Sequence, residues 1–318
     1  MKLGYFAVIA VSLVALGACE NPGDDSESRE TQQESEPEEE SEPKEAAEEG
    51  ASERTEALPP DEWIEERVEQ AEKRLSETEE GELVWRSIEA HGGLERWYAN
   101  GPIYFRFDYR PLGERPPNDT YSLVDTWSSR ARQWVADDRD VQFGWDGEKG
   151  WLNPPDAETH IKPRFWALTP YYFIAMPFVL ADPGTNLEHV GTDEVHGREH
   201  DLVKATYEED VGDSPDDYYI VYLDKETGEL GGLRYVVAYP GIVEEGERTP
   251  EKLMVYDEFE DFDGVSLATR FDTYAWDEET DERKDLVTEV DMSDVEFRPD
   301  ISDDDFEVPE GAEVIEEY

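Results

Sequence analysis

The sequence predicts a mainly β protein of the α+β class, built as one curved antiparallel half-barrel with N-terminal helices and a helical segment inserted in mid-sheet. Three observations lead to this prediction. Between Ile103 and Phe297 the apolar residues recur with period 2, glycine-containing turns separate the runs, and one nearly uncharged, proline-containing stretch interrupts them. Hydrophobic residues make up 37% of the 318 residues, which is enough for a core.

The charge of the chain argues against one class of partner. The chain has 83 Asp and Glu against 28 Lys and Arg, a formal net charge of −55. A nucleic-acid surface needs clustered cations, so we expect no nucleic acid as a partner. From Leu83 onward, 57 acidic and 21 basic residues still leave −36, and lysine supplies only 9 of the cations of the whole chain. This dispersed acidity is typical of salt-adapted proteins.

The first residues have the features of a secretion signal. Lys2 precedes an apolar run that is too short to span a bilayer comfortably. The run ends in Leu16-Gly17-Ala18-Cys19, which resembles the lipobox of bacterial lipoproteins. This resemblance implies that residues 1–18 are a signal peptide and that Cys19 carries acyl groups such as palmitate. An ordinary secreted protein is the alternative.

Residues 19–60 are expected to form a disordered acidic tether. They consist mostly of Glu, Ser, Pro, Ala and Gly, and cannot bury enough apolar surface to offset the entropy lost on ordering. The lipobox resemblance then implies an envelope protein held at a membrane through its N-terminal lipid. Glu20 stands where aspartate would favour the inner membrane, so the outer membrane is expected.

The folded domain is predicted over residues 61–318 and begins with helices. Asp61 is a suitable N-cap, and apolar residues follow it at helical spacing up to Leu75, before Gly81 ends the helix. A second helix is predicted from Leu83 to Ala90. His91 is expected at its C-terminal end, where a cation suits the helix dipole.

Strands follow the helices nearly to the end of the chain. Ile103, Phe105, Phe107 and Tyr109 alternate with polar residues, and similar runs follow from Thr120–Trp127 to Asp285–Phe297. Residues that tolerate positive φ separate the runs at Asp146-Gly147, His196-Gly197, Thr227-Gly228 and Asp263-Gly264. These runs predict about ten or eleven strands in one sheet that curls on itself.

One segment between Pro163 and Pro183 does not fit the strand pattern. Its internal prolines exclude a central strand and a long helix, so short helical turns or loop are expected. The segment is either a plug that fills the core or a lid over an apolar cavity. The lid hypothesis assigns Phe165, Trp166, Tyr171, Tyr172, Phe173, Met176, Phe178 and Leu180.

The order of these features resembles the LolA and LolB lipoprotein carriers. The ending from Phe306 to Val314 is similar to the F-x-x-P-x-G-x-x-V tail of that family. Two stretches, Glu89–Trp97 and Tyr172–Gly184, also resemble a family of uncharacterised bacterial lipoproteins. The resemblance implies a half-barrel that receives a lipid or the acyl group of a lipoprotein.

Such a half-barrel is expected to hold acyl chains in an apolar cavity, because each methylene that leaves water contributes about 0.8 kcal/mol. The ligand is then a lipid or an acylated protein, which the chain binds or transfers. The residues expected to line the cavity are Phe105, Phe107, Trp127, Trp134, Tyr219, Val221, Tyr235, Val237 and Phe271.

The sequence gives no sign of catalysis. It lacks the nucleophile elbow, the His-Glu-x-x-His pair and the glycine-rich phosphate loops, so we expect no enzyme, no cofactor and no metal. His196 and His200 flank a turn without a third ligand at recognisable spacing. The alternative to a carrier is a structural or partner-binding lipoprotein with a filled core, whose exposed Trp and Tyr side chains dock another protein.

Overall fold

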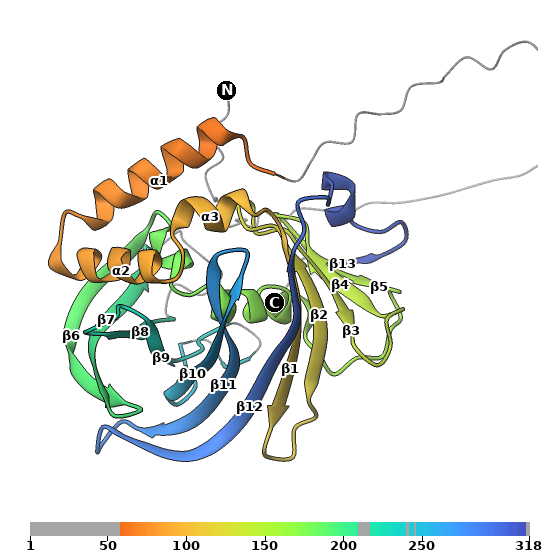
Figure 1. The fold of residues 1–318 in the computed structure, drawn as a ribbon. Helices are drawn as coiled ribbons and strands as arrows, with labels where there is room; N and C mark the ends of the chain where they lie inside the picture. The colour runs from red at the N-terminus through yellow and green to blue at the C-terminus, as the bar shows by residue number, and fades with distance from the viewer. Residues whose placement is uncertain (1–57, 209–216, 240–241, 245, 316–318) are drawn as a thin grey trace, which may run out of the picture. The chain divides into compact units, whose positions relative to one another are not determined.

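The structure is a computed structural model, which describes residues 58–208, 217–239, 242–244 and 246–315. These residues form one antiparallel sheet of thirteen strands (Figure 1). The strands are β1 (Ile103–Pro111), β2 (Asn118–Val124), β3 (Ala131–Val135), β4 (Gln142–Trp145), β5 (Gly150–Asn153), β6 (Thr185–Val195), β7 (Arg198–Tyr207), β8 (Tyr219–Asp224), β9 (Leu230–Tyr235), β10 (Lys252–Phe262), β11 (Val265–Asp277), β12 (Glu282–Phe297) and β13 (Glu313–Ile315).

The sheet is curved and open. Its strand order is β13-β5-β4-β3-β2-β1-β12-β11-β10-β9-β8-β7-β6, so within the described residues β13 and β6 are unpaired edges. The prediction of a curved antiparallel half-barrel is confirmed. The expected ten or eleven strands were too few, chiefly because the C-terminal tail adds β13 to β5 through Val314, opposite Trp151.

Three helices precede the sheet: α1 (Asp61–Leu75), α2 (Glu79–Ala90) and α3 (Leu94–Ala99). Two predicted details of their ends are wrong. Pro60 occupies the N-cap position of α1 instead of Asp61. Gly81 does not end α1 but lies inside α2. Glycine is needed at this position because a Cβ there would lie 2.1 Å from the Leu75 carbonyl oxygen. Thr78 caps α2 by accepting the Gly81 amide.

Two of the predicted turns show why their residue types are needed. His196 and Gly197, between β6 and β7, have φ values of 52° and 73°. Asp263 and Gly264, between β10 and β11, have φ values of 51° and 82°. Positive φ at both central residues suits the right-handed twist of a two-residue hairpin. These turns join neighbouring strands directly, as predicted.

The main core lies on the inner side of the curved sheet, where the helices pack (Figure 1). Successive residues of one strand separate to the two faces. Val203 and Val221 belong to the main core, whereas Leu202 and Tyr222 belong to a smaller cluster on the outer face. In the described residues, no helix has both the length and the apolar character to cross a membrane.

The segment that interrupts the strands lies between β5 and β6 and forms two short helices and a 3-10 turn: α4 (Pro163–Trp166), α5 (Thr169–Ile174) and η1 (Phe178–Ala181). We call residues 163–181 the insert. Short helical turns were predicted here, and the insert has no strand of its own. A second 3-10 turn, η2 (Asp303–Phe306), precedes β13.

The N-terminal predictions fall outside the described residues. They comprise the signal peptide over 1–18, lipidation of Cys19 and most of the tether over 19–60. They stay predictions.

Candidate functional site

The inner face of the sheet brings most of the predicted cavity residues together. Phe105, Phe107, Val221, Tyr235 and Phe271 are buried in the main core. Trp127, Tyr219 and Val237 are partly buried and pack against the same core. These side chains come from β1, β8, β9 and β11 and from the segments that follow β2 and β9. Together they form a continuous apolar surface on the concave side.

Trp134 is the exception, because the structure places it on the outer face. It packs with Tyr104 against a small cluster of Leu123, Ile301 and Phe306. Its neighbour Gln133 takes the inward position and is fully buried. The assignment of Trp134 to the cavity is therefore corrected. Alternation correctly predicted that adjacent residues of β3 face opposite ways, but the inward residue is polar.

The insert covers this inner surface with its own aromatic rings. Trp166 lies 6.3 Å from Phe107, between ring centroids, and Phe173 lies 5.2 Å from Tyr235. Of the predicted lid residues, Trp166, Tyr171, Phe173, Met176, Phe178 and Leu180 are buried, while Phe165 and Tyr172 are partly buried. The rings of the insert therefore fill the space in which the sequence predicted a ligand.

Hydrogen bonds in both directions attach the insert to the sheet and its adjoining segments. The Gln133 amide donates to the carbonyl oxygens of Trp166 and Ala167 at 2.8 and 2.7 Å. The Tyr256 hydroxyl donates to the Phe173 carbonyl at 2.8 Å. In the other direction, Trp166 Nε1 donates to Thr120 Oγ1 at 3.2 Å, and the Tyr171 and Tyr172 hydroxyls donate to the Thr126 carbonyl and the Tyr207 hydroxyl at 3.3 and 3.2 Å. The insert takes no part in the strand ladder.

Helix α1 holds the C-terminal end of the insert. The Arg67 guanidinium pairs with Asp182, which directly follows η1. Arg74 donates to the carbonyl oxygens of Leu180 and Asp182 at 3.2 Å. Burial raises the pKa of the neighbouring Tyr98 to about 12, so this phenol stays protonated beside Arg67. We call the contacts of Arg67 and Arg74 with residues 180–185 the clamp.

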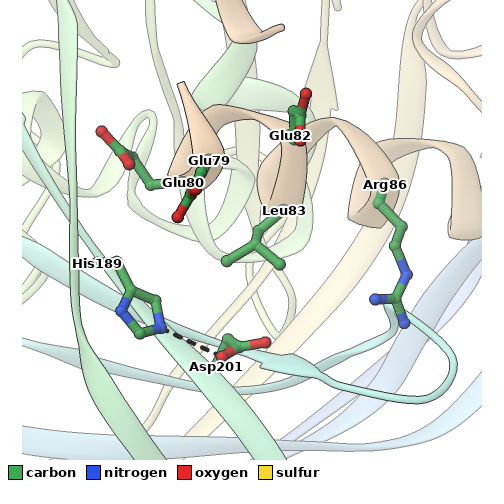
Figure 2. A pocket seen from close by; sticks show the side chains of 7 residues that line it. All are labelled: Glu79, Glu80, Glu82, Leu83, Arg86, His189 and Asp201. Carbon is green, nitrogen blue, oxygen red and sulfur yellow. Dashed lines mark hydrogen bonds and ion pairs between the residues drawn. The ribbon is translucent and has the colours of Figure 1, made fainter. Parts of the chain in front are cut away.

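The two hollows found in the described part of the chain lie elsewhere. One has a volume of about 490 Å³ and lies between α2 and strands β6 and β7 (Figure 2). The other has a volume of about 470 Å³ and lies on the outer face at β1, β2 and β12. None of the predicted cavity residues lines either hollow. The predicted lining therefore lies away from both of these hollows, beneath the rings of the insert.

The hollow beside α2 is strongly acidic. Figure 2 shows Leu83 directed from α2 toward the strands, with Asp201 below it hydrogen-bonded to His189 at 3.1 Å. Arg86 is engaged with backbone carbonyls of the β8–β9 turn. The remaining lining residues are Glu79, Glu80 and Glu82. Three acids in the first turn of a helix also complement its dipole, so they have a structural role without a ligand.

The histidines considered as a metal pair do not form one. His200 is buried, and its Nδ1 lies 2.9 Å from the Arg198 carbonyl. The His196 side chain is half exposed and lies 4.0 Å from Asp257. Among the described residues, no group of three or more His, Cys, Asp or Glu side chains is arranged to hold a metal ion.

Comparison with known proteins gives similar structures without a family assignment. No family model and no curated protein matches the chain. Similar solved structures include a LolA superfamily protein from Nitrosomonas europaea, with 12% identity and a TM-score of 0.47 over 72% of this chain and 97% of that one. A DUF1329 family protein from Desulfovibrio piger has 12% identity and a TM-score of 0.47 over 71% of this chain and 95% of that one.

A domain of an outer membrane lipoprotein-sorting protein from Vibrio parahaemolyticus has 10% identity and a TM-score of 0.45 over 71% of this chain and 94% of that one. The LolA superfamily, to which the sequence showed a resemblance, is thus among the proteins of similar structure. The fold described above rests on the strand pairing itself, and no ligand or activity follows from similarities of this level.

Proposed function

We propose that the protein binds acyl chains of a lipid or an acylated protein on its concave face, and that the insert moves aside to admit them. The N-terminal lipid on Cys19 would hold the protein at a membrane of the cell envelope, with the outer membrane as the expected one. Transfer of the bound chain to another carrier is part of the same proposal. Binding of this kind requires neither a catalytic group nor a cofactor.

The observation that carries the proposal is the way in which the insert is attached. It contributes no strand, so its departure leaves the thirteen-stranded ladder intact. Its buried side chains pack against apolar groups of the core, as Phe178 packs on Trp97, with the two ring centroids 4.5 Å apart. Contacts of this kind have little directional preference, and hydrocarbon chains can replace them.

The magnitudes favour a ligand with more than one acyl chain. A chain of about 16 carbons gains roughly 13 kcal/mol on leaving water, whereas exposing all the lid side chains costs roughly 12–24 kcal/mol. One acyl chain therefore offsets the cost of exposing the lid side chains only if that cost is near roughly 12 kcal/mol, the lower end of its range. Two chains, as in a diacyl lipid or a diacylated protein, offset it throughout this range.

Binding can be tested with the full-length chain carrying Cys19→Ser, so that no acyl group of its own competes. A fluorescent diacyl lipid should bind at micromolar concentration. Tyr256→Phe removes the hydrogen bond to the Phe173 carbonyl, worth about 1 kcal/mol. If the insert must leave, this variant should bind about fivefold more tightly.

Tyr222→Phe is the matched control for that experiment. The Tyr222 hydroxyl donates to Asp193 at 3.3 Å on the outer face, so its loss should leave lipid affinity unchanged. A flat titration with the parent chain and both variants would remove the proposal.

The filled inner face favours a second candidate function. A protein with its core filled by the insert can serve as a structural or partner-binding lipoprotein. The same titration separates the two functions, because a scaffold takes up no lipid even when the hydrogen bond of Tyr256 is removed.

A further inference from the structure

The outer face of the sheet carries a row of aromatic rings that the acyl-binding proposal does not use. Tyr104 on β1, Tyr121 on β2 and Trp134 on β3 are neighbours across three strands. The Tyr104 ring centroid lies 5.8 Å from that of Tyr121 and 6.4 Å from that of Trp134. All three side chains are half-buried. We call these three residues the aromatic row.

The outer hollow of about 470 Å³ lies along this row, lined by Tyr104, Tyr121, Asp294, Val295 and Glu296. A β-bulge in β12 forms its second wall. Tyr104 is paired with Glu296, but Arg106 is paired with Ser293, so Asp294 and Val295 together stand opposite the single residue Phe105, and β12 has one extra residue there. Asp294 has a φ of 53°. Bulges of this kind redirect side chains and are common beside binding sites.

Charged groups of both signs surround the rings, although only the carboxylates of Asp294 and Glu296 line the hollow itself. The Arg106 guanidinium, paired with Asp119, lies 5.7 Å from the Tyr121 ring centroid. The Arg139 guanidinium lies 3.3 Å from the Tyr121 ring centroid, and that of Arg132 lies 5.7 Å from the Trp134 centroid. Neither arginine has a carboxylate within ion-pair distance among the described residues. Asp294 and Glu296 are exposed on the opposite side. Arginines therefore flank the rings beside a hollow whose own charged lining residues are acidic.

We propose that this hollow binds a neutral oligosaccharide built of pyranose rings. The apolar face of a pyranose ring packs on Tyr104, as flat apolar groups do on aromatic faces. The Tyr121 ring supports Tyr104 and is itself covered by Arg139. The carboxylates of Asp294 and Glu296 accept hydrogen bonds from sugar hydroxyls, and the Arg139 guanidinium donates to hydroxyl oxygens. Aromatic surface with a few converging polar groups is typical of a small-ligand site.

The charges of the site select against other occupants. An anionic ligand meets Asp294 and Glu296 and the field of the acidic domain, whereas a cationic ligand meets Arg132 and Arg139. A second copy of the chain would bring the same acidic surface into contact with itself. A neutral polyhydroxyl ligand avoids all three penalties.

The test is calorimetric titration of the full-length chain with maltotriose, cellotriose and chitotriose, and with an anionic sialylated trisaccharide for comparison. At least one neutral trisaccharide should bind with millimolar or stronger affinity, and the anionic one should bind at least tenfold more weakly. Tyr104→Ala should weaken binding about tenfold, and Tyr104→Phe, which keeps the ring, should retain most of it.

Tyr274→Ala provides the matched control. Tyr274 is also a half-buried tyrosine on the outer face with an arginine over its ring, Arg283 at 4.8 Å. It lies beside Leu286, toward the other end of β12 from Glu296. This variant should bind sugar like the parent chain. Absence of binding by every neutral trisaccharide, preferred binding of the anionic one, or equal loss in Tyr104→Ala and Tyr274→Ala would overturn the proposal.

Discussion

The imidazole of His91 accepts a hydrogen bond from the backbone amide of Leu230, with 3.0 Å between His91 Nε2 and the amide nitrogen. Its other nitrogen, Nδ1, lies 2.8 Å from the Ser266 carbonyl and donates to it. One buried ring thus joins the end of α2 to the first residues of β9 and β11. The neutral ring satisfies both partners, whereas a protonated ring has no lone pair for Leu230. The predicted role of His91 as a cation at a helix end is corrected accordingly.

Stability should therefore fall in mild acid through His91. Burial lowers the pKa of His91 in the folded protein below its ordinary value of 6.5. As pH falls below about 6.5 the unfolded chain takes up a proton that the folded chain does not, so the contribution of His91 to the unfolding free energy decreases. Between pH 7.5 and 5.5 the decrease should be at most about 1.4 kcal/mol, the value for a folded-state ring that takes up no proton in this range.

The measurement is urea unfolding of the parent chain and of His91→Gln at both pH values. The glutamine does not titrate, so the stability difference between the two proteins should shrink toward pH 5.5. Other titrating groups are common to both proteins and cancel in this difference. A difference that stays constant between the two pH values would contradict the prediction.

Local patterns were sufficient to predict the sheet, because each strand carries its own alternation. Phe105 and Phe107 are inward, as their period-2 spacing indicates. The three-residue strand β13 has no alternation long enough to recognise. Its pairing with β5 depends on a contact between distant parts of the chain. Only the folded sheet provides that contact.

The same patterns were insufficient at the site. Both faces of β3 carry large or polar residues. Because Trp134 is more hydrophobic than Gln133, the sequence pattern favoured Trp134 as the inward residue, which is wrong. Gln133 is inward because the carbonyls of Trp166 and Ala167 need a donor there. Sequence spacing also does not show whether the aromatic insert packs into the core or stands away from it. That outcome depends on the shape of the surface that receives it.

Replacement of Gly231 by alanine should destabilise the protein. A Cβ at this position would lie 2.2 Å from Nε2 of His200, whose ring is buried and cannot easily move. Overpacking of this kind costs about 1–3 kcal/mol. Thermal unfolding should show a lower midpoint for Gly231→Ala. At Gly113 nothing lies within 4 Å of such a Cβ, so Gly113→Ala should leave the midpoint nearly unchanged. Equal midpoints for the two variants would contradict the predicted overlap.

Gln133→Leu should loosen the insert. It removes the donor for the buried carbonyls of Trp166 and Ala167, at a cost of about 1–3 kcal/mol in unfolding free energy. Hydrogen exchange at residues 165–175 should become faster. The control is Gln142→Leu on the neighbouring strand. The Gln142 side chain accepts from Arg132 at 2.7 Å and, among the described residues, has no hydrogen bond to the insert. Faster exchange in both variants would show that the effect is general to the sheet.

Arg74→Met should weaken the clamp between α1 and the insert, leaving only the Arg67–Asp182 ion pair. This substitution keeps an apolar stem but removes the donors to the Leu180, Asp182 and Thr185 carbonyls. Helix α1 makes its main packing contacts with α2 and α3, and the clamp links it by hydrogen bonds to the end of the insert. Hydrogen exchange should accelerate together at residues 61–75 and 178–185.

Lys73→Met is the control that distinguishes loss of the Arg74 hydrogen bonds from loss of a positive charge on α1. Lys73 is exposed on the same helix, and its replacement removes the same positive charge in a strongly acidic protein. Surface substitutions of this kind change stability by less than about 0.5 kcal/mol. Exchange at residues 178–185 should therefore match the parent chain in Lys73→Met and exceed it only in Arg74→Met. If the two variants accelerate this segment equally, repulsion among acidic groups is the cause, and α1 does not hold the insert through Arg74.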